Sequence, residues 1–224
     1  RVCQMKKRKK NAVIYSLSDL SRYEGELREG KYHGHGILTF YAREDLPAAK
    51  YIGEWKEGEM NGKGILEFDD GMRYEGEFRN GLSHGIGVMQ WPPGEKYVGE
   101  FKDDDFNGNG VLTGSSGVRY EGEFKDGEFH GRGVLTHPDE LQGGWSDPNF
   151  KNHHIRYEGD FKKGEYFGNA TVTYRDGSSI QGRVKVNEFF GKSIVTLANS
   201  IKYEFSWSGK KKKNEIITWP DGSK

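Results

Sequence analysis

The chain has 224 residues, among them 33 glycines, and 13% of its residues are aromatic while only 33% are hydrophobic. So little aliphatic material excludes a thick two-layer core of this length, and so many aromatic residues are not typical of a disordered chain. The formal net charge is zero, but residues 11–209 alone carry 32 acidic and 23 basic residues, a net charge of −9. This acidic body repels phosphate backbones, so we expect no nucleic-acid partner.

Basic charge is concentrated at the two ends of the sequence. Residues 1–10 form a basic N-terminal segment with six basic side chains, and four lysines follow one another from Lys210 to Lys213. Cys3 is the only cysteine, which excludes an internal disulfide and suits a reducing compartment. No apolar run approaches the roughly 18 residues of a membrane span, and no signal peptide is visible, so we expect a cytoplasmic protein. Because the chain begins with Arg1, we also expect it to be a fragment.

One phrase, Tyr-Glu-Gly-Glu-Phe, recurs with small variations along most of the chain. Its first position falls at Tyr23, Tyr51, Tyr74, Tyr97, Tyr120, Tyr157, Ile180 and Tyr203. Five of the seven intervals are 23 residues long, and the other two contain insertions near 41–50 and 137–156. The pattern predicts an array of eight repeats over 23–209, preceded by a degenerate half-repeat at 11–22. Residues 210–224 are expected to be a basic segment and the start of a further partial repeat.

Each repeat is predicted to be a β-hairpin. The phrase at residues 120–124 alternates with period two, so its rings and glycine share one face and its glutamates share the other, which we expect to be solvated. A second phrase, Gly-x-Gly-x-Leu, begins eleven residues after the first and alternates in the same way, as at residues 131–135. The short glycine-containing turn between them, for example at residues 126–130, joins the two strands. We interpret the strand glycines as space for a neighbouring ring.

The longer insertion, 137–156, contains the residues of an ordered loop that presents Trp145. The alternative is a neutral surface excursion of the kind that loops tolerate.

These motifs resemble the MORN (membrane occupation and recognition nexus) repeat family. The resemblance covers about residues 23–209 and rests on Tyr-Glu-Gly-Glu-Phe, His-Gly-x-Gly and Asp-Gly-x-x-Tyr, as at residues 70–74. It implies an all-β fold, an elongated single-layer antiparallel sheet of tandem hairpins that is open, twisted and solenoid-like, with a groove lined by the aromatic residues. The late repeats depart from the pattern at Ala170, Ile180, Ser193 and Phe205, so we expect them to be less regular or covered by a partner.

Two sets of side chains are candidate interaction residues. The partner-binding groove is predicted to contain the rings of the first phrase, Tyr23, Tyr51, Trp55, Tyr74, Phe78, Tyr97, Phe101, Tyr120, Phe124, Tyr157 and Phe161. The candidate rim contacts stand at the tenth position of six of seven repeats, at Tyr32, Met60, Phe106, Phe129, Tyr166 and Phe189. A rim ring either folds back over its own hairpin or the next one, or belongs to a ladder that binds a second copy of the array or an extended partner.

No catalytic residue, cofactor site or metal site is predicted. The turn histidines His33, His84 and His130 occupy equivalent positions in alternate repeats, about 19 Å apart, whereas metal–nitrogen bonds measure about 2 Å. The histidines His137, His153 and His154 near the longer insertion lack a cysteine or an acidic partner at metal-binding spacing. The glutamate pairs recur in most repeats, which indicates a solvated surface and not a glycosidase pocket.

The sequence therefore favours a non-catalytic protein-interaction scaffold that binds partner helices or extended peptides along the aromatic groove. The family resemblance implies a cytoskeletal, ciliary or cortical assembly. The alternatives are a peripheral membrane or phosphoinositide-binding module, which would contact anionic lipid through the basic flanks, and a targeting region of a larger enzyme. A homodimer through the rim is a further alternative.

Overall fold

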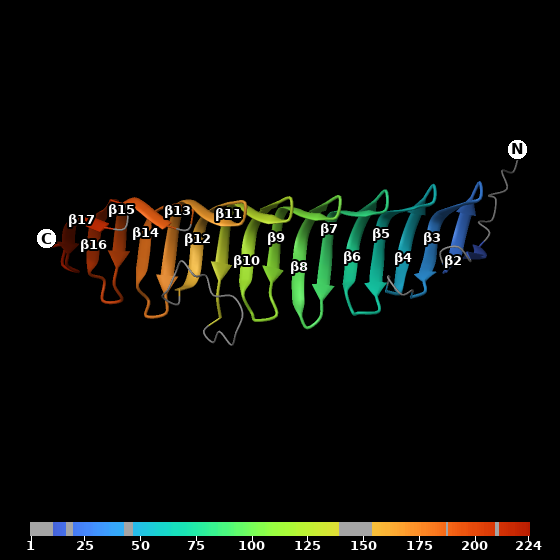
Figure 1. The fold of residues 1–224 in the computed structure, drawn as a ribbon, viewed down its shortest axis with the longest axis horizontal. Helices are drawn as coiled ribbons and strands as arrows, with labels where there is room; N and C mark the ends of the chain where they lie inside the picture. Colours follow the sequence, from blue (N-terminus) through green and yellow to red (C-terminus); the bar gives the residue numbers. More distant parts are fainter. Residues whose placement is uncertain (1–10, 17–19, 43–46, 139–153, 187, 209–210) are drawn as a thin grey trace, which may run out of the picture. The chain divides into compact units, whose positions relative to one another are not determined.

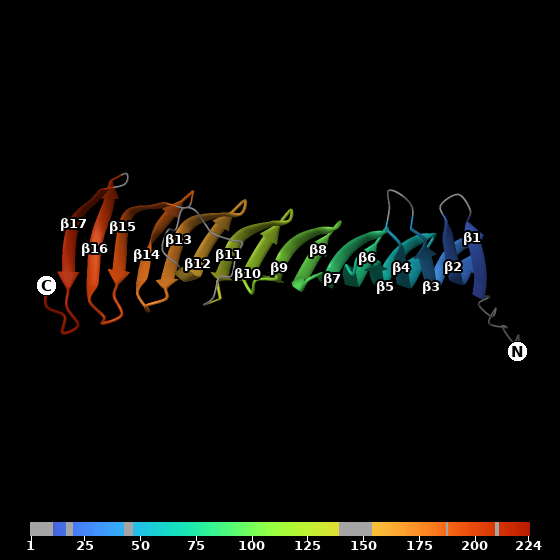
Figure 2. The same ribbon diagram turned by 60° about the horizontal axis from the view of Figure 1, so that its bottom comes forward.

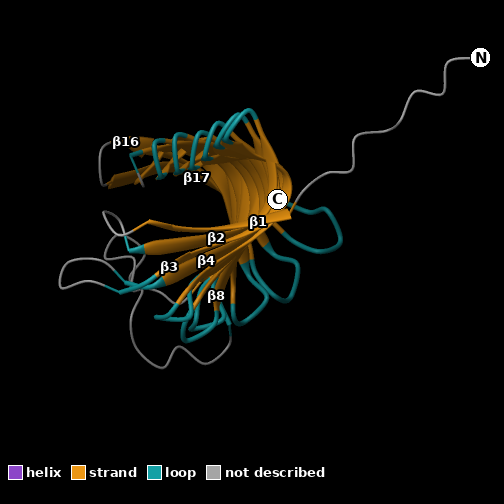
Figure 3. Ribbon diagram, turned by 90° about the vertical axis from the view of Figure 1, so that its right-hand side faces the viewer, coloured by secondary structure: helices purple, strands orange, loops and turns teal. Residues whose placement is uncertain are grey.

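The computed structural model consists of strands joined by turns, and it describes residues 11–16, 20–42, 47–138, 154–186, 188–208 and 211–224. These residues contain no helix (Figure 3). The chain divides into two compact units, the N-terminal unit Arg1–Asp105 and the C-terminal unit Phe106–Lys224.

The N-terminal unit is a meander of antiparallel strands (Figure 1). Its strands are β1 (Asn11–Ser16), β2 (Ser21–Arg28), β3 (Lys31–Phe40), β4 (Ala49–Lys56), β5 (Glu59–Phe68), β6 (Arg73–Arg79), β7 (Leu82–Trp91) and β8 (Glu95–Lys102). Each strand pairs with the next one along the chain. The unit is therefore a succession of hairpins in one open layer, as predicted.

The C-terminal unit repeats this arrangement (Figure 2). Its strands are β9 (Asp105–Thr113), β10 (Arg119–Lys125), β11 (Glu128–Thr136), β12 (His154–Lys162), β13 (Glu165–Tyr174), β14 (Ser179–Lys185), β15 (Glu188–Thr196), β16 (Lys202–Ser208) and β17 (Lys211–Thr218). Consecutive strands again pair antiparallel. The all-β fold of tandem hairpins is confirmed in both units.

Two-residue turns close the hairpins. In the turn between β10 and β11, Asp126 and Gly127 have φ angles of 51° and 80°, and they separate the paired residues Lys125 and Glu128. Positive φ at both central residues matches the right-handed twist of the flanking strands. The predicted role of glycine in these turns is confirmed.

A bulge interrupts the hairpins at the same place in successive repeats. Gly122 pairs with Gly133, whereas the next residue, Glu123, pairs with His130, so β11 holds two more residues than β10 between these pairs. The first of the two, Gly131, has a φ of 51°. A bulge of this kind bends the bulged strand. Equivalent register shifts follow Gly25, Gly53, Gly76, Gly159 and Gly182.

The late hairpins continue the pattern despite their substitutions. Ile180 replaces the tyrosine of its repeat, and the smaller side chain leaves room for Ser193, which replaces the glycine and is 2% exposed. The Ser193 hydroxyl accepts a hydrogen bond of 3.1 Å from the indole N–H of Trp207. The predicted irregularity is therefore limited to side chains, because one substitution compensates for the other.

Candidate protein-binding groove

In each unit, the rings predicted to line a groove lie on one face of the strands. Tyr23, Tyr51, Trp55, Tyr74, Phe78, Tyr97, Phe101, Tyr120, Phe124, Tyr157 and Phe161 are 0–5% exposed, so they form the hydrophobic core and not an open surface. Neighbouring rings meet edge-on: Tyr51 lies 5.1 Å from Trp55 of its own repeat and 5.0 Å from Phe78 of the next, measured between ring centroids. The period-two pattern predicts rings that are open on one side, and it carries no sign of the bulges that bend the strands.

Polar bonds hold these rings in place. The Tyr51 hydroxyl donates a hydrogen bond of 2.9 Å to the backbone carbonyl of Glu54, and equivalent bonds recur in the other repeats. The indole N–H of Trp55 donates to the carbonyl of Gly36 at 3.2 Å. Burial raises the pKa of Tyr23 to about 12 and also raises the pKa of Tyr51.

Three of the rim rings fold back over their own hairpins. Tyr32 stacks on Tyr23 with centroids 3.8 Å apart, Phe129 stacks on Tyr120 at 3.8 Å, and Tyr166 stacks on Tyr157 at 4.0 Å. Of the remaining rim residues, Met60, Phe106 and Phe189 are half-buried. The packing of the three stacked rings agrees with the local alternative, and contact of the rim with a second copy stays a prediction.

The opposite face of the N-terminal unit carries an apolar row that crosses the strands. The pairing register places Glu24, Ile37, Ile52, Ile65, Glu75, Val88 and Val98 side by side on β2 to β8. Ile52 and Val98 are 37% and 39% exposed. Five aliphatic side chains thus share one line on a face that the sequence pattern had assigned to solvated glutamates.

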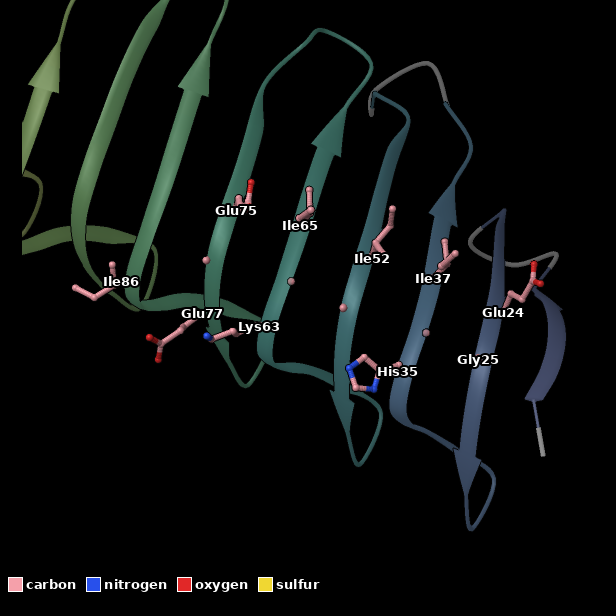
Figure 4. Close-up of a pocket in the computed structure, with 14 residues that line it drawn as sticks. Glu24, Gly25, His35, Ile37, Ile52, Lys63, Ile65, Glu75, Glu77 and Ile86 are labelled. Atoms are coloured by element: carbon pink, nitrogen blue, oxygen red, sulfur yellow. The ribbon is translucent and has the colours of Figure 1, made fainter. Parts of the chain in front are cut away.

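A groove follows this row in the N-terminal unit (Figure 4). It has a volume of about 770 Å³. Its floor is the backbone of the glycines from Gly25 to Gly76, whose missing side chains leave room for the tyrosine rings on the opposite face. One wall is formed by Glu24, Ile37, Ile52, Ile65 and Glu75, and the other by His35, Lys63, Glu77 and Ile86. Ile86 is 59% exposed, so apolar surface faces solvent on both walls.

Charge of opposite sign flanks the apolar row. The neighbouring row on one side, here called the basic row, carries Arg22, Lys50, Glu67, Arg73 and Lys96. The neighbouring row on the other side, the acidic row, carries Glu26, Glu54, Lys63, Glu77 and Glu100. The groove therefore runs between a net positive and a net negative edge.

A corresponding groove of about 1020 Å³ lies in the C-terminal unit. The register there places Glu158, Thr171, Gln181, Ile194, Glu204 and Ile216 in the position of the apolar row. Its other wall includes Arg132, Arg183 and Lys192. At these positions the C-terminal groove is mostly polar, whereas the N-terminal groove is mostly aliphatic. Equivalent positions of the repeats therefore carry different chemistry in the two units.

The repeated glycine, tyrosine and bulge geometry is that of one sequence family. The sequence model of the MORN repeat matches residues 23–42, 51–73, 74–96, 97–119, 120–141 and 157–179, which together make up more than half of the chain. The chain belongs to the MORN repeat family. Hairpins β14–β15 and β16–β17 continue the array beyond the last matched residue. Membership of the family indicates a repeat-based, non-catalytic module that interacts with another protein or with a membrane.

Comparison with other proteins adds little to the MORN match. No curated protein matches the chain. Among solved structures, the TCP domain of SAS-4 (dCPAP) from Drosophila melanogaster, in complex with a proline-rich motif of Ana2 (dSTIL), is 10% identical. The match covers 88% of this chain and 90% of that domain with a TM-score of 0.28.

The second acidic residue of several MORN phrases has a structural role that the sequence did not reveal. The Glu54 carboxylate accepts a hydrogen bond of 3.1 Å from the backbone N–H of Lys63, inside the bulge, and lies against Gly62. Glu26, Glu123 and Asp160 make the equivalent contact in their repeats. The glutamates keep the predicted solvated face, since Glu123 is exposed, and at this position the carboxylate also accepts a backbone N–H of the bulge.

The turn histidines contact acids of the following MORN repeat. Nδ1 of His33 lies 3.7 Å from Glu57, and Nδ1 of His84 lies 3.4 Å from Asp103. Among the described residues, no group of three or more His, Cys, Asp or Glu side chains is arranged to hold a metal ion. No helix in the described ranges is long and apolar enough to cross a membrane.

Some sequence predictions fall outside the described residues. They concern Trp145, His153 and the basic segment 1–10.

Proposed function

We propose that this MORN array is a non-catalytic protein-interaction scaffold that binds a helical or extended segment of a partner in the groove of its N-terminal unit. We propose that the scaffold belongs to a cytoskeletal, ciliary or cortical assembly, because MORN arrays occur in such assemblies. The same proposal places the protein in the cytoplasm.

The observation that carries the proposal is the exposed apolar row beside a groove of about 770 Å³. The aromatic core is complete without these side chains, since its rings are already 0–5% exposed. Ile37, Ile52 and Ile65 therefore contribute nothing to that ring packing, and they gain free energy when a partner covers them, at about 25 cal/mol per Å² of apolar surface. An apolar surface rimmed by charge is typical of an interaction site.

The spacing of the row suits an α-helix laid across the strands. Neighbouring strands lie about 4.8 Å apart, so Ile37 and Ile65 are separated by roughly 10 Å. Residues i and i+7 on one helix face are about 10.5 Å apart at 1.5 Å per residue. A helix with apolar residues at i, i+3 and i+7 can thus place one of them against each isoleucine.

We also propose that a partner can contact the eleven aromatic rings directly. Since these rings are buried in the unbound chain, such contact requires a partner that opens the ring packing.

A binding assay with a synthetic peptide tests the groove. We would label an 18-residue amphipathic helix that carries leucines at positions 1, 4, 8, 11, 15 and 18, and measure its fluorescence anisotropy with the full chain. Ile52→Asp is expected to weaken binding by about tenfold or more, because it places a charge in the apolar row. Leu82→Asp is the matched control, since Leu82 is 39% exposed in the same unit but does not line the groove. Equal affinities of the two variants, or no binding at all, would contradict the proposal.

Peripheral membrane binding is the second candidate function, favoured by the basic row and by the lysines of β17, of which Lys213 is exposed. Flotation with phosphatidylcholine vesicles, with and without phosphatidylinositol 4,5-bisphosphate, tests it at physiological salt. The scaffold proposal expects the chain to stay in the unbound fraction with both vesicles, whereas flotation only with the phosphoinositide supports the alternative.

A further inference from the structure

The apolar row of the N-terminal groove is interrupted at one position. Glu75 on β6 lies between Ile65 on β5 and Val88 on β7, and both pairings are direct. Its side chain is 56% exposed and lines the groove wall. A helix that covers the row from Ile37 to Val98 therefore has to place one residue against a carboxylate.

The carboxylate of Glu75 can pair with a second cation in addition to Arg73. Its Oε2 atom contacts Nη2 of Arg73 at 2.7 Å, and Arg73 also contacts Glu67 through Nε at 3.1 Å. If a partner's basic side chain approaches Glu75, Arg73 keeps Glu67 as its counter-ion. The pair can thus accept a cation without leaving a guanidinium unpaired, which is the condition under which a charged contact favours binding.

The flanking rows add a second requirement. A helix in the groove turns one flank toward the basic row, which includes Lys50 and Lys96, and the other flank toward the acidic row, which includes Glu77 and Glu100. Acidic residues on the first flank and basic residues on the second complement these rows, and the reverse arrangement juxtaposes like charges.

Building on the proposed function, we propose that this groove selects a helical partner segment with one basic residue set into its apolar stripe, opposite Glu75. The position follows from the strand spacing. Glu75 lies three strands from Ile37, about 14 Å, which corresponds to about ten residues of helix. In an 18-residue helix the basic residue stands at position 11 when the helix starts at Ile37, and at position 8 when it runs in the opposite direction.

Three peptides test this proposal. The first has the six leucines described above. The second has arginine in place of the leucine at peptide position 11, and the third has arginine in place of the leucine at peptide position 8. Each is measured against the full chain by fluorescence anisotropy. We expect one arginine peptide to bind the natural chain on the order of tenfold more tightly than the all-leucine peptide, since one such pair contributes about that factor.

Two substitutions then identify the carboxylate. Glu75→Ile makes the row continuously apolar, so the preference is expected to reverse and the all-leucine peptide to bind best. Glu67→Gln leaves the groove lining unchanged but removes the second counter-ion of Arg73, so it is expected to reduce the preference for arginine without reversing it. Circular dichroism of both variants checks that they fold alike.

The failures of the two proposals are distinguishable. If the all-leucine peptide binds and Ile52→Asp abolishes this binding, but neither arginine peptide is preferred, the groove is a docking site and the selection by Glu75 is refuted. An arginine preference that Glu75→Ile leaves unchanged also refutes it. If none of the three peptides binds, the proposed function itself fails.

Discussion

The ring of Tyr120 lies directly on Gly133 of the neighbouring strand β11. A Cβ atom at Gly133 would stand 2.6 Å from Cζ of this ring, well inside van der Waals contact. Gly122 pairs with Gly133, and a Cβ atom there would stand 2.7 Å from the hydroxyl oxygen of the same tyrosine. A sheet of one layer can bury its tyrosines in this way because the backbone, bare of side chains at both glycines, serves as the surface on which each ring packs.

This contact predicts that Gly133→Ala destabilises the chain. The added methyl group displaces a ring that is 1% exposed and held by a hydrogen bond, and overpacking of this kind costs about 1–3 kcal/mol of unfolding free energy. Gly114→Ala is the matched control in the same unit, because a Cβ at Gly114 would lie 3.7 Å or more from its neighbours. Thermal melting of both variants decides: equal melting temperatures would show that the ring tolerates the methyl group.

The hairpins could be read from the sequence, whereas the position of the groove could not. Period-two alternation around Tyr120 and the regular spacing of the repeats determine the strands and the faces of their side chains. The same alternation places Glu75 and Ile65 on one face, but the line that joins Ile37, Ile52 and Ile65 depends on the cross-strand register. That register includes two extra residues at each bulge, and a single sequence does not indicate whether they lie in the strand or in the turn.

Alkaline pH is expected to destabilise the fold through the buried tyrosines. Burial raises the pKa of Tyr23 to about 12, and it also raises the pKa of Tyr120, whereas an unfolded tyrosine titrates near 10. Above pH 10 the unfolded chain releases protons that the folded chain retains. The unfolding free energy therefore stays constant below about pH 10 and falls between about pH 10 and pH 12.

Urea unfolding at several pH values measures this dependence. Tyr120→Phe is the informative variant, because it removes one of the titrating groups and should make the decline with pH shallower. The same variant loses the hydrogen bond of 2.9 Å to the carbonyl of Glu123, so at pH 7 it is expected to be less stable by about 1 kcal/mol. A decline with pH as steep as that of the natural chain would argue against the linkage.

The two glutamates of one repeat are expected to differ. Glu123 accepts the backbone N–H of Arg132 at 3.0 Å, so Glu123→Ala should cost about 0.5–1.5 kcal/mol of unfolding free energy. Glu121 forms an exposed ion pair of 2.6 Å with Arg119, and the loss of such a pair costs about 0–1 kcal/mol. Chemical denaturation in about 0.05 M and about 0.5 M salt separates the two, since only the Glu121 effect should shrink with salt. Two equal, salt-dependent losses would mean that the contact with the bulge contributes nothing.

The stacking of Phe129 on Tyr120 predicts how the rim responds to mutation. The double change Phe106→Ser and Phe129→Ser removes one ring that stacks at 3.8 Å and another that meets Phe124 at 5.9 Å, so we expect a lower melting temperature in the isolated chain. Phe190→Ser is the control, because Phe190 is 36% exposed.

Sedimentation velocity distinguishes this local role from a rim that joins two copies of the array. If the rings only pack locally, the double variant melts earlier and sediments as the natural chain does at every concentration. If they form an interface between copies, the natural chain sediments faster as its concentration rises, and the double variant loses this dependence while it keeps its melting temperature. We expect the first result, because a ring that already covers the buried Tyr120 has one face committed to its own hairpin.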